Sequence, residues 1–137
     1  MTHAIRPALQ EPPIVLDSAF SDRLEALAAV AMRGSAAELG DRLMREVARA
    51  TVLPSGEMPG DVVNIGSEVN FRDDVTGRAQ TVVVVLPEAA DIAARRISVL
   101  TPIGAALIGL RAGASIGWET RDGEERRLTV LEVRRAI

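Results

Sequence analysis

The sequence predicts an α+β protein, in which a short antiparallel helical hairpin (coiled coil) precedes a small, mostly antiparallel sheet with one short helix. Apolar residues recur with helical spacing before residue 53 and alternate with polar residues after residue 60. Between these regions, residues 53–60 contain two prolines and two glycines, a composition typical of a connection. We therefore expect a flexible N-terminal tail (1–16), a helical hairpin (17–52), a linker (53–60) and a C-terminal domain (61–137).

The first helix is predicted from apolar residues that share one helical face: Leu24, Leu27, Ala28 and Ala31. Ser18 or Ser21 could provide its N-terminal cap, and the sequence does not decide between them. Gly34 suits the left-handed position that often follows the end of a helix. Residues 32–35 therefore form the expected tip of the hairpin: Met32, Arg33, Gly34 and Ser35.

The second helix is predicted to start at a capping box, Ser35-Ala36-Ala37-Glu38, in which serine and glutamate each bind a free backbone amide. Its expected apolar face comprises Ala36, Leu39, Leu43, Val47 and Ala50. Gly40 should weaken this helix by about 1 kcal/mol relative to alanine. Glu38 and Asp41 share a face and could together hold a metal ion, but the capping box explains Glu38 and an ion pair with Arg45 explains Asp41.

The second half of the chain has the alternation typical of strands. We expect strands at 67–72, 78–86, 96–100, 115–120 and 125–133. Thr101 and Pro102 should open a short helix through Leu110, because threonine is a good N-cap and proline suits the first helical position. The spacing of Gly104 and Gly109 matches a phosphate-binding loop, but the lysine that such a loop needs is absent. We therefore expect these glycines to serve close packing of a helix.

Composition excludes several classes of function. The chain has no cysteine and one histidine, His3, so disulfides, thiolate metal sites, two-histidine metal sites and a Ser-His-Asp triad are excluded. Aromatic residues make up only 2% of the chain, so few side chains could stack on the bases of a single-stranded nucleic acid. The net charge of −3 also argues against direct sequence-specific nucleic-acid binding. Carboxylates at residues 73–74 and 122–125 coincide with expected turns. We expect no metal and no cofactor.

No targeting or membrane-spanning segment is expected. Residues 1–16 contain three prolines and lack the apolar stretch of a signal peptide. The apolar runs further along the chain are much too short to span a membrane. We therefore expect a cytoplasmic protein that does not bind membranes and is a monomer.

Three segments carry a resemblance to a known family: Met58-Pro59-Gly60-Asp61-Val62-Val63, Gly66-Ser67-Glu68-Val69, and the stretch 97–113 around Thr101-Pro102-Ile103-Gly104-Ala105-Ala106-Leu107. Together with Trp118 in the next strand, they resemble the C-terminal domain of Gre-type transcription elongation factors. Within that family they are similar to the Rnk subfamily, the regulators of nucleoside diphosphate kinase. The resemblance covers residues 57–134.

The resemblance implies an FKBP-like C-terminal domain after an antiparallel coiled coil. Such proteins bind RNA polymerase with this domain on the rim of the secondary channel and the coiled coil pointing inward. The polymerase contact implied by the match lies at the start of the short helix: Leu100, Thr101, Pro102 and Ile103. Gre factors often have an acid at the position of Leu100, so this contact should be more apolar. The domain has too few aromatic residues for the prolyl isomerase pocket that its fold name suggests.

Gre factors also carry acids at the tip of the coiled coil that help the polymerase cleave RNA. The tip of this chain has none, and its hairpin is much shorter. We therefore expect a regulator, not an enzyme, that binds RNA polymerase and competes with Gre factors without stimulating cleavage. Three alternatives stay open: regulation of nucleoside diphosphate kinase, directly or through its expression; a cleavage-stimulating Gre homologue that uses Glu38 and Asp41; and an FKBP-like module with an unrelated partner.

Overall fold

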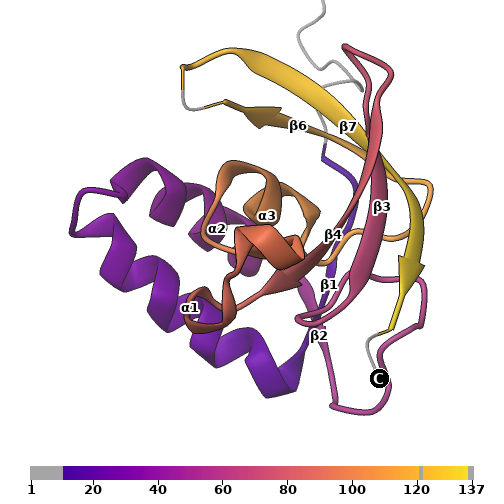
Figure 1. The fold of residues 1–137 in the computed structure, drawn as a ribbon. Helices are drawn as coiled ribbons and strands as arrows, with labels where there is room; N and C mark the ends of the chain where they lie inside the picture. The colour runs from indigo at the N-terminus through magenta and orange to yellow at the C-terminus, as the bar shows by residue number, and fades with distance from the viewer. Residues whose placement is uncertain (1–10, 121, 136–137) are drawn as a thin grey trace, which may run out of the picture.

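The structure is a computed structural model that describes residues 11–120 and 122–135 of the chain (Figure 1). Its first half consists of strand β1 (Val15–Asp17), helices α1 (Ser18–Met32) and α2 (Ala37–Arg49), and strand β2 (Thr51–Leu53). The two helices form an antiparallel hairpin, as the sequence predicts. His3 and the first ten residues of the expected tail lie outside the described residues.

The second half is a five-stranded sheet with the order β5-β4-β3-β7-β6. Its strands are β3 (Glu68–Asp73), β4 (Ala79–Val85), β5 (Arg96–Ser98), β6 (Ser115–Glu119) and β7 (Glu125–Arg134). All neighbours are antiparallel except β4 and β5, which are joined through the 3-10 turns η2 (Pro87–Ala89) and η3 (Ile92–Ala94). The sheet curls around helix α3 (Pro102–Leu107). This arrangement confirms the predicted α+β class.

The start and end of α1 differ from the prediction. Asp17, and not Ser18 or Ser21, is its N-cap: Asp17 is extended, and its Oδ1 accepts a hydrogen bond from the Ala19 amide at 2.8 Å. Gly34 is not left-handed. The amides of Arg33 and Gly34 instead donate to carbonyls three residues back, both at 3.1 Å. These bonds satisfy carbonyls of the last turn, so no left-handed residue is needed.

The predicted capping box does not form. The N-cap of α2 is Ala36, which has no side-chain cap, because Ser35 belongs to the turn that precedes the helix. On the predicted apolar face Leu43 is fully buried, whereas the other four residues are half-buried. The remaining buried residues of α2 are Gly40 and, unexpectedly for a charged residue, Glu46.

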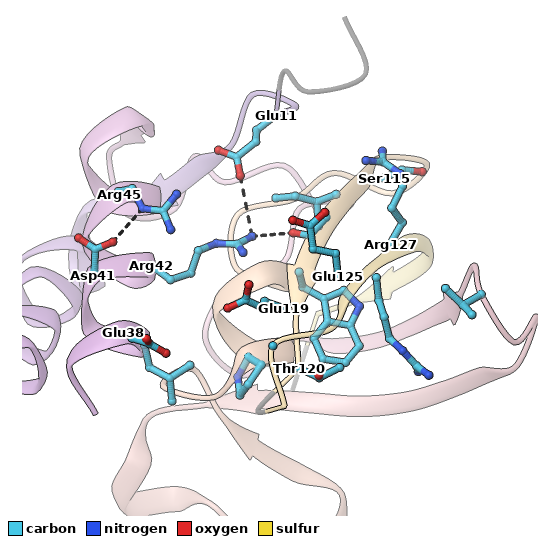
Figure 2. Close-up of a pocket in the computed structure, with 18 of the residues that line it drawn as sticks. Glu11, Glu38, Asp41, Arg42, Arg45, Ser115, Glu119, Thr120, Glu125 and Arg127 are labelled. Carbon is cyan, nitrogen blue, oxygen red and sulfur yellow. Dashed lines mark hydrogen bonds and ion pairs between the residues drawn. The ribbon is translucent and has the colours of Figure 1, made fainter. Parts of the chain in front are cut away.

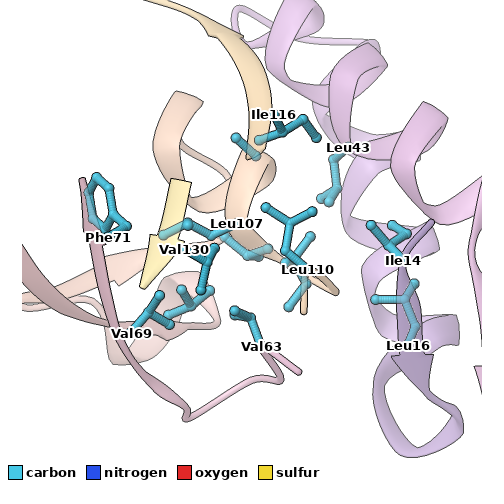
Figure 3. Close-up of a cluster of buried hydrophobic side chains, with 14 of the residues drawn as sticks. Ile14, Leu16, Leu43, Val63, Val69, Phe71, Leu107, Leu110, Ile116 and Val130 are labelled. Atoms are coloured by element: carbon cyan, nitrogen blue, oxygen red, sulfur yellow. The ribbon is translucent and has the colours of Figure 1, made fainter. Parts of the chain in front are cut away.

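The core joins the hairpin to the sheet. One cluster of buried apolar side chains includes Leu43 of α2, Leu110 after α3, and Phe71 and Val130 of the sheet (Figure 3). Ile14 belongs to the same cluster and is 1% exposed. The hairpin is therefore not a separate body attached by a linker.

The end of the expected tail is corrected by this packing. Residues 15 and 16 lie in β1, which pairs in parallel with β2, and Leu16 is 2% exposed. The Val15 amide donates to the carbonyl of Gly109 at 3.1 Å, so the chain before α1 is anchored at the exit of α3. α3 ends at Leu107, before the predicted Leu110, because the backbone of Ile108 is already non-helical. Gly109 follows with φ +83°, and a Cβ there would lie 2.9 Å from Ile14 Cβ.

None of the helices in the part of the chain that the structure describes has the length and apolar character needed to cross a membrane.

Candidate functional site

The loop that opens α3 is held by its own hydrogen bonds. The Ser98 hydroxyl accepts from the Leu100 amide at 2.9 Å, and the Thr101 hydroxyl donates to the Ser98 carbonyl at 2.7 Å. Thr101 Oγ1 also accepts from the Gly104 amide at 3.1 Å. Thr101 is therefore the N-cap of α3, with Pro102 in the first turn, as predicted. Leu100, Thr101, Pro102 and Ile103 are all half-buried.

Gly104 lets α3 approach β5 very closely. A Cβ at this position would lie 2.2 Å from the carbonyl oxygen of Ser98. The close approach at Gly104 confirms the predicted close packing of a helix for that glycine. Gly109 instead lies after the end of α3 and approaches Ile14 and Val15. Ser98, which orients the whole loop, was missed by sequence reasoning. The signal that could have found it is its place three residues before Thr101, within reach of the N-cap hydroxyl.

A groove of about 1260 Å³ lies beside this loop, between α2 and the β6–β7 hairpin. Ser35, Glu38 and Asp41 line it from the helical hairpin, and Pro102 lines it from the start of α3. The other candidate residues do not line it: Met32, Arg33, Gly34, Leu100, Thr101 and Ile103. The structure thus brings together one residue of the candidate polymerase loop and three residues at or just after the hairpin tip.

The side of the groove formed by β6 and β7 carries Trp118, Glu119 and Glu125 (Figure 2). Trp118 Nε1 is buried and makes no hydrogen bond to any described residue. The carboxylates of Glu38 and Glu119 point toward the space between α2 and β6. The groove therefore combines an aromatic side chain with carboxylates.

The surroundings of the two carboxylates near the tip, Glu38 and Asp41, do not indicate a metal site. Asp41 forms an exposed ion pair with Arg45 at 3.2 Å, as predicted. Glu38 is exposed in the first turn of α2, where a negative charge interacts favourably with the helix dipole. Among residues 11–120 and 122–135, no group of three or more His, Cys, Asp or Glu side chains could hold a metal ion.

The expected turn carboxylates Asp73 and Asp74 are fixed by arginines at the end of the groove. Asp73 forms an ion pair with Arg126 at 2.7 Å. Burial alone would raise the pKa of Asp74. The net effect is a lowered pKa, because the carboxylate accepts hydrogen bonds from Thr129 and Arg72 and lies near the positive charges of Arg72 and Arg127. Both carboxylates thus have structural roles in the turn.

A buried ionic cluster beside the groove was also missed. Glu46 of α2 has a side chain that is 1% exposed and lies between Arg42, at 2.9 Å, and Arg49, at 2.7 Å. Arg42 also donates to the carbonyl of Gly117 in β6 at 3.0 Å, and Arg49 donates to the carbonyl of Pro12. A signal was present, since arginines precede Glu46 by four residues and follow it by three, but such spacing is also common on exposed helices.

The class of protein to which this fold belongs is given by the family comparison. The family model "Transcription elongation factor, GreA/GreB, C-term" matches residues 58–135. The chain belongs to the GreA/GreB family of transcription elongation factors.

The particular relatives agree with the resemblance to the Rnk subfamily. The chain is similar to the regulator of nucleoside diphosphate kinase from Escherichia coli strain K12, with 34% identity over 125 residues that cover 91% of both chains. It is 35% identical over 101 residues to the transcription elongation factor GreA of Azorhizobium caulinodans, covering 74% of this chain and 61% of that protein. A solved GreA/GreB structure from Nitrosomonas europaea superposes with a TM-score of 0.69 and 34% identity, over 90% of this chain and 99% of that one.

Proposed function

We propose that this protein is a transcription regulator that binds RNA polymerase near the secondary channel and competes with Gre factors without stimulating RNA cleavage. Two observations together carry this proposal: the loop at Leu100–Ile103 is held by its own hydrogen bonds, and the hairpin tip, residues 32–35, contains no acid. We also propose that it acts in the cytoplasm, as a monomer.

The geometry of the loop supports a binding role. The hydroxyls of Ser98 and Thr101 hold the loop in one conformation, so little freedom is lost when a partner binds. Pro102 keeps part of its surface free and lines the groove. The half-buried Leu100 and Ile103 pack against the core and support the loop from beneath.

The chemistry of the tip supports the absence of cleavage. Stimulated cleavage of this kind needs carboxylate oxygens that help hold a metal at the reacting phosphate. The tip, residues 32–35, offers none, and Asp41, one turn into α2, is paired with Arg45. The protein therefore acts through occupancy of a site on the polymerase and not as an enzyme.

The substitution Pro102→Ala tests the contact. We expect it to weaken binding to core RNA polymerase by about tenfold, because it truncates a side chain at the centre of the proposed interface. Binding can be measured by biolayer interferometry with immobilised polymerase, and circular dichroism verifies that the fold is retained, since alanine is tolerated where Pro102 sits.

Pro87→Ala is the matched control. Pro87 also stands at the start of a short helix, but it is exposed on η2 and does not line the groove. The Pro87→Ala variant should bind the polymerase with the same affinity as the wild type. Equal affinity of the Pro102→Ala variant and the wild type would contradict the proposed contact.

A second candidate is regulation of nucleoside diphosphate kinase, which is favoured by the name of the Escherichia coli relative. The rate of purified kinase, measured with and without this protein, distinguishes direct from indirect regulation. A changed rate would favour a direct interaction, whereas an unchanged rate together with polymerase binding would favour an effect through expression.

A further inference from the structure

The ionic cluster at Glu46 joins three parts of the molecule that are distant in sequence. Its centre is the triad Arg42–Glu46–Arg49 on α2. Arg42 reaches β6 through the Gly117 carbonyl, and Arg49 reaches the chain before β1 through the Pro12 carbonyl. Glu11 adds a second carboxylate, 4.0 Å from Arg42 and 3.4 Å from Arg49. The triad therefore lies where the hairpin meets the rest of the fold (Figure 2 shows Arg42 and Glu11).

The apolar contacts at this junction stabilise the fold but do little to fix the orientation of α2. Leu43 is completely buried on the same helix and belongs to the common core. Hydrophobic burial depends on the area removed from water and not on orientation. The hydrogen bonds from Arg42 and Arg49 depend on both distance and angle. They therefore select one orientation of α2 among those that would bury Leu43.

A buried triad of this kind is not an obvious source of stability. Removing charges from water is costly, and apolar side chains of similar volume often replace buried ion pairs without loss of stability. The best-supported role for such groups is the selection of one arrangement over others. The side chains of Arg42 and Arg49 are 15% and 25% exposed, so the pairs are largely removed from solvent.

We propose that the Arg42–Glu46–Arg49 triad is an orientation lock that fixes the helical hairpin relative to the sheet. The lock presents Ser35 of the hairpin tip and Pro102, which both line the groove, to one partner as a single rigid surface. The consequence for the partner rests on the proposed polymerase binding, whereas the lock itself does not. Glu46 is thus a positioning residue that acts through α2.

The triple variant Arg42→Met/Glu46→Leu/Arg49→Met tests the lock. It removes the charges and the bonds to Gly117 and Pro12 but keeps apolar volume at the junction. Because the chain has no cysteine, spin labels can be placed at Val30→Cys, near the tip, and Val75→Cys, in the β3–β4 turn. These residues are 61% and 62% exposed, and electron-electron double resonance gives the distribution of distances between the labels.

We expect the triple variant to stay folded with a Tm close to that of the wild type, while its distance distribution widens by about twofold. Its unlabelled form should bind core RNA polymerase about tenfold more weakly. The variant Glu132→Ala/Arg134→Ala removes an exposed ion pair on β7 and should change neither quantity. If the triple variant does not fold, Glu46→Gln gives the same test with a smaller disturbance.

An unchanged distance distribution in a folded variant would overturn the lock. A widened distribution with unchanged polymerase affinity would support the lock but overturn its proposed consequence for the partner, because orientation would then not matter to binding. If the wild type itself fails to bind polymerase, the proposed function is wrong, but the distance measurement still decides whether the lock exists.

Discussion

Asp17 shows how a single side chain connects the two halves of the molecule. Its Oδ1 caps α1 by accepting from the Ala19 amide, and its Oδ2 accepts from the side-chain amide of Asn64 at 3.0 Å. The residue is 7% exposed, so its carboxylate is satisfied mainly by these protein donors. The start of the hairpin is thereby tied to the segment that leads into β3.

Asp17→Ala should therefore destabilise the protein by about 1–2 kcal/mol, because an N-cap is lost and Asn64 loses a buried acceptor. Ser21→Ala is the matched control, since Ser21 lies inside α1, where alanine is the better helix former. Urea unfolding measures both free energies. A larger loss for Ser21→Ala than for Asp17→Ala would contradict the assignment of the cap.

Some roles that depend on near neighbours in the chain were predictable, whereas roles that depend on distant contacts were not. Thr101 was recognised as a cap because Pro102 follows it directly. Asp17 was overlooked although its capping bond to Ala19 is local, because Ser18 and Ser21 were preferred as caps. Its second bond, to Asn64, 47 positions away, was not predictable from the sequence. Glu46 has the sequence context of an ordinary helix-surface residue. Its burial depends on the packing of α2, and the contacts beyond α2 are made by Arg42 and Arg49.

At the scale of elements, the crossing of α1 and α2 depends on Gly40. A Cβ there would lie 2.6 Å from the Met32 amide nitrogen and 2.8 Å from the Ala28 carbonyl oxygen. The sequence suggested only that Gly40 weakens its own helix. The structure shows that the missing side chain lets the two helices come into backbone contact near the tip.

Gly40→Ala should destabilise the protein by about 2–3 kcal/mol, because the two helices must move apart despite the better helix propensity of alanine. Gly34→Ala is the control in the same hairpin: a Cβ there would lie 3.9 Å from the Ala31 carbonyl oxygen. This change should stay within about 0.5 kcal/mol of the wild type. Thermal unfolding followed by circular dichroism measures both, and a neutral Gly40→Ala would contradict the close crossing.

Most elements were predicted from the sequence because their apolar periodicity is local. The strands at 68–73 and 79–85 and the start of α3 agree with the expected ranges. Element ends were less predictable. Ser35 and Glu38 have the residue types and spacing of a capping box, but Ser35 lies in the turn before α2, and Ala36 is the N-cap. Turn geometry between packed helices is set by the crossing itself, which the sequence pattern does not contain.

At the scale of the whole molecule, the hairpin, the chain before it and the curled sheet share one core. The expected tail, which runs through residue 16, includes two residues of β1. Because β1 has only three residues, it is too short to be recognised as a strand from the sequence. The groove between α2 and β6 could not be predicted either, since it depends on how the hairpin is placed against the sheet. The start of α3 at Thr101 and Pro102 was predicted, but not the position of Pro102 beside that groove.

We propose that this protein occupies the polymerase site used by Gre factors and lacks their chemistry. The most direct test is one reaction with a backtracked elongation complex that carries labelled RNA, a Gre factor at fixed concentration and increasing amounts of this protein. We expect Gre-stimulated cleavage to fall with dose, and no shortening of the RNA when this protein acts alone. Cleavage by this protein alone that is lost in Glu38→Ala/Asp41→Ala, or Gre-stimulated cleavage that does not change at saturating protein, would contradict the account.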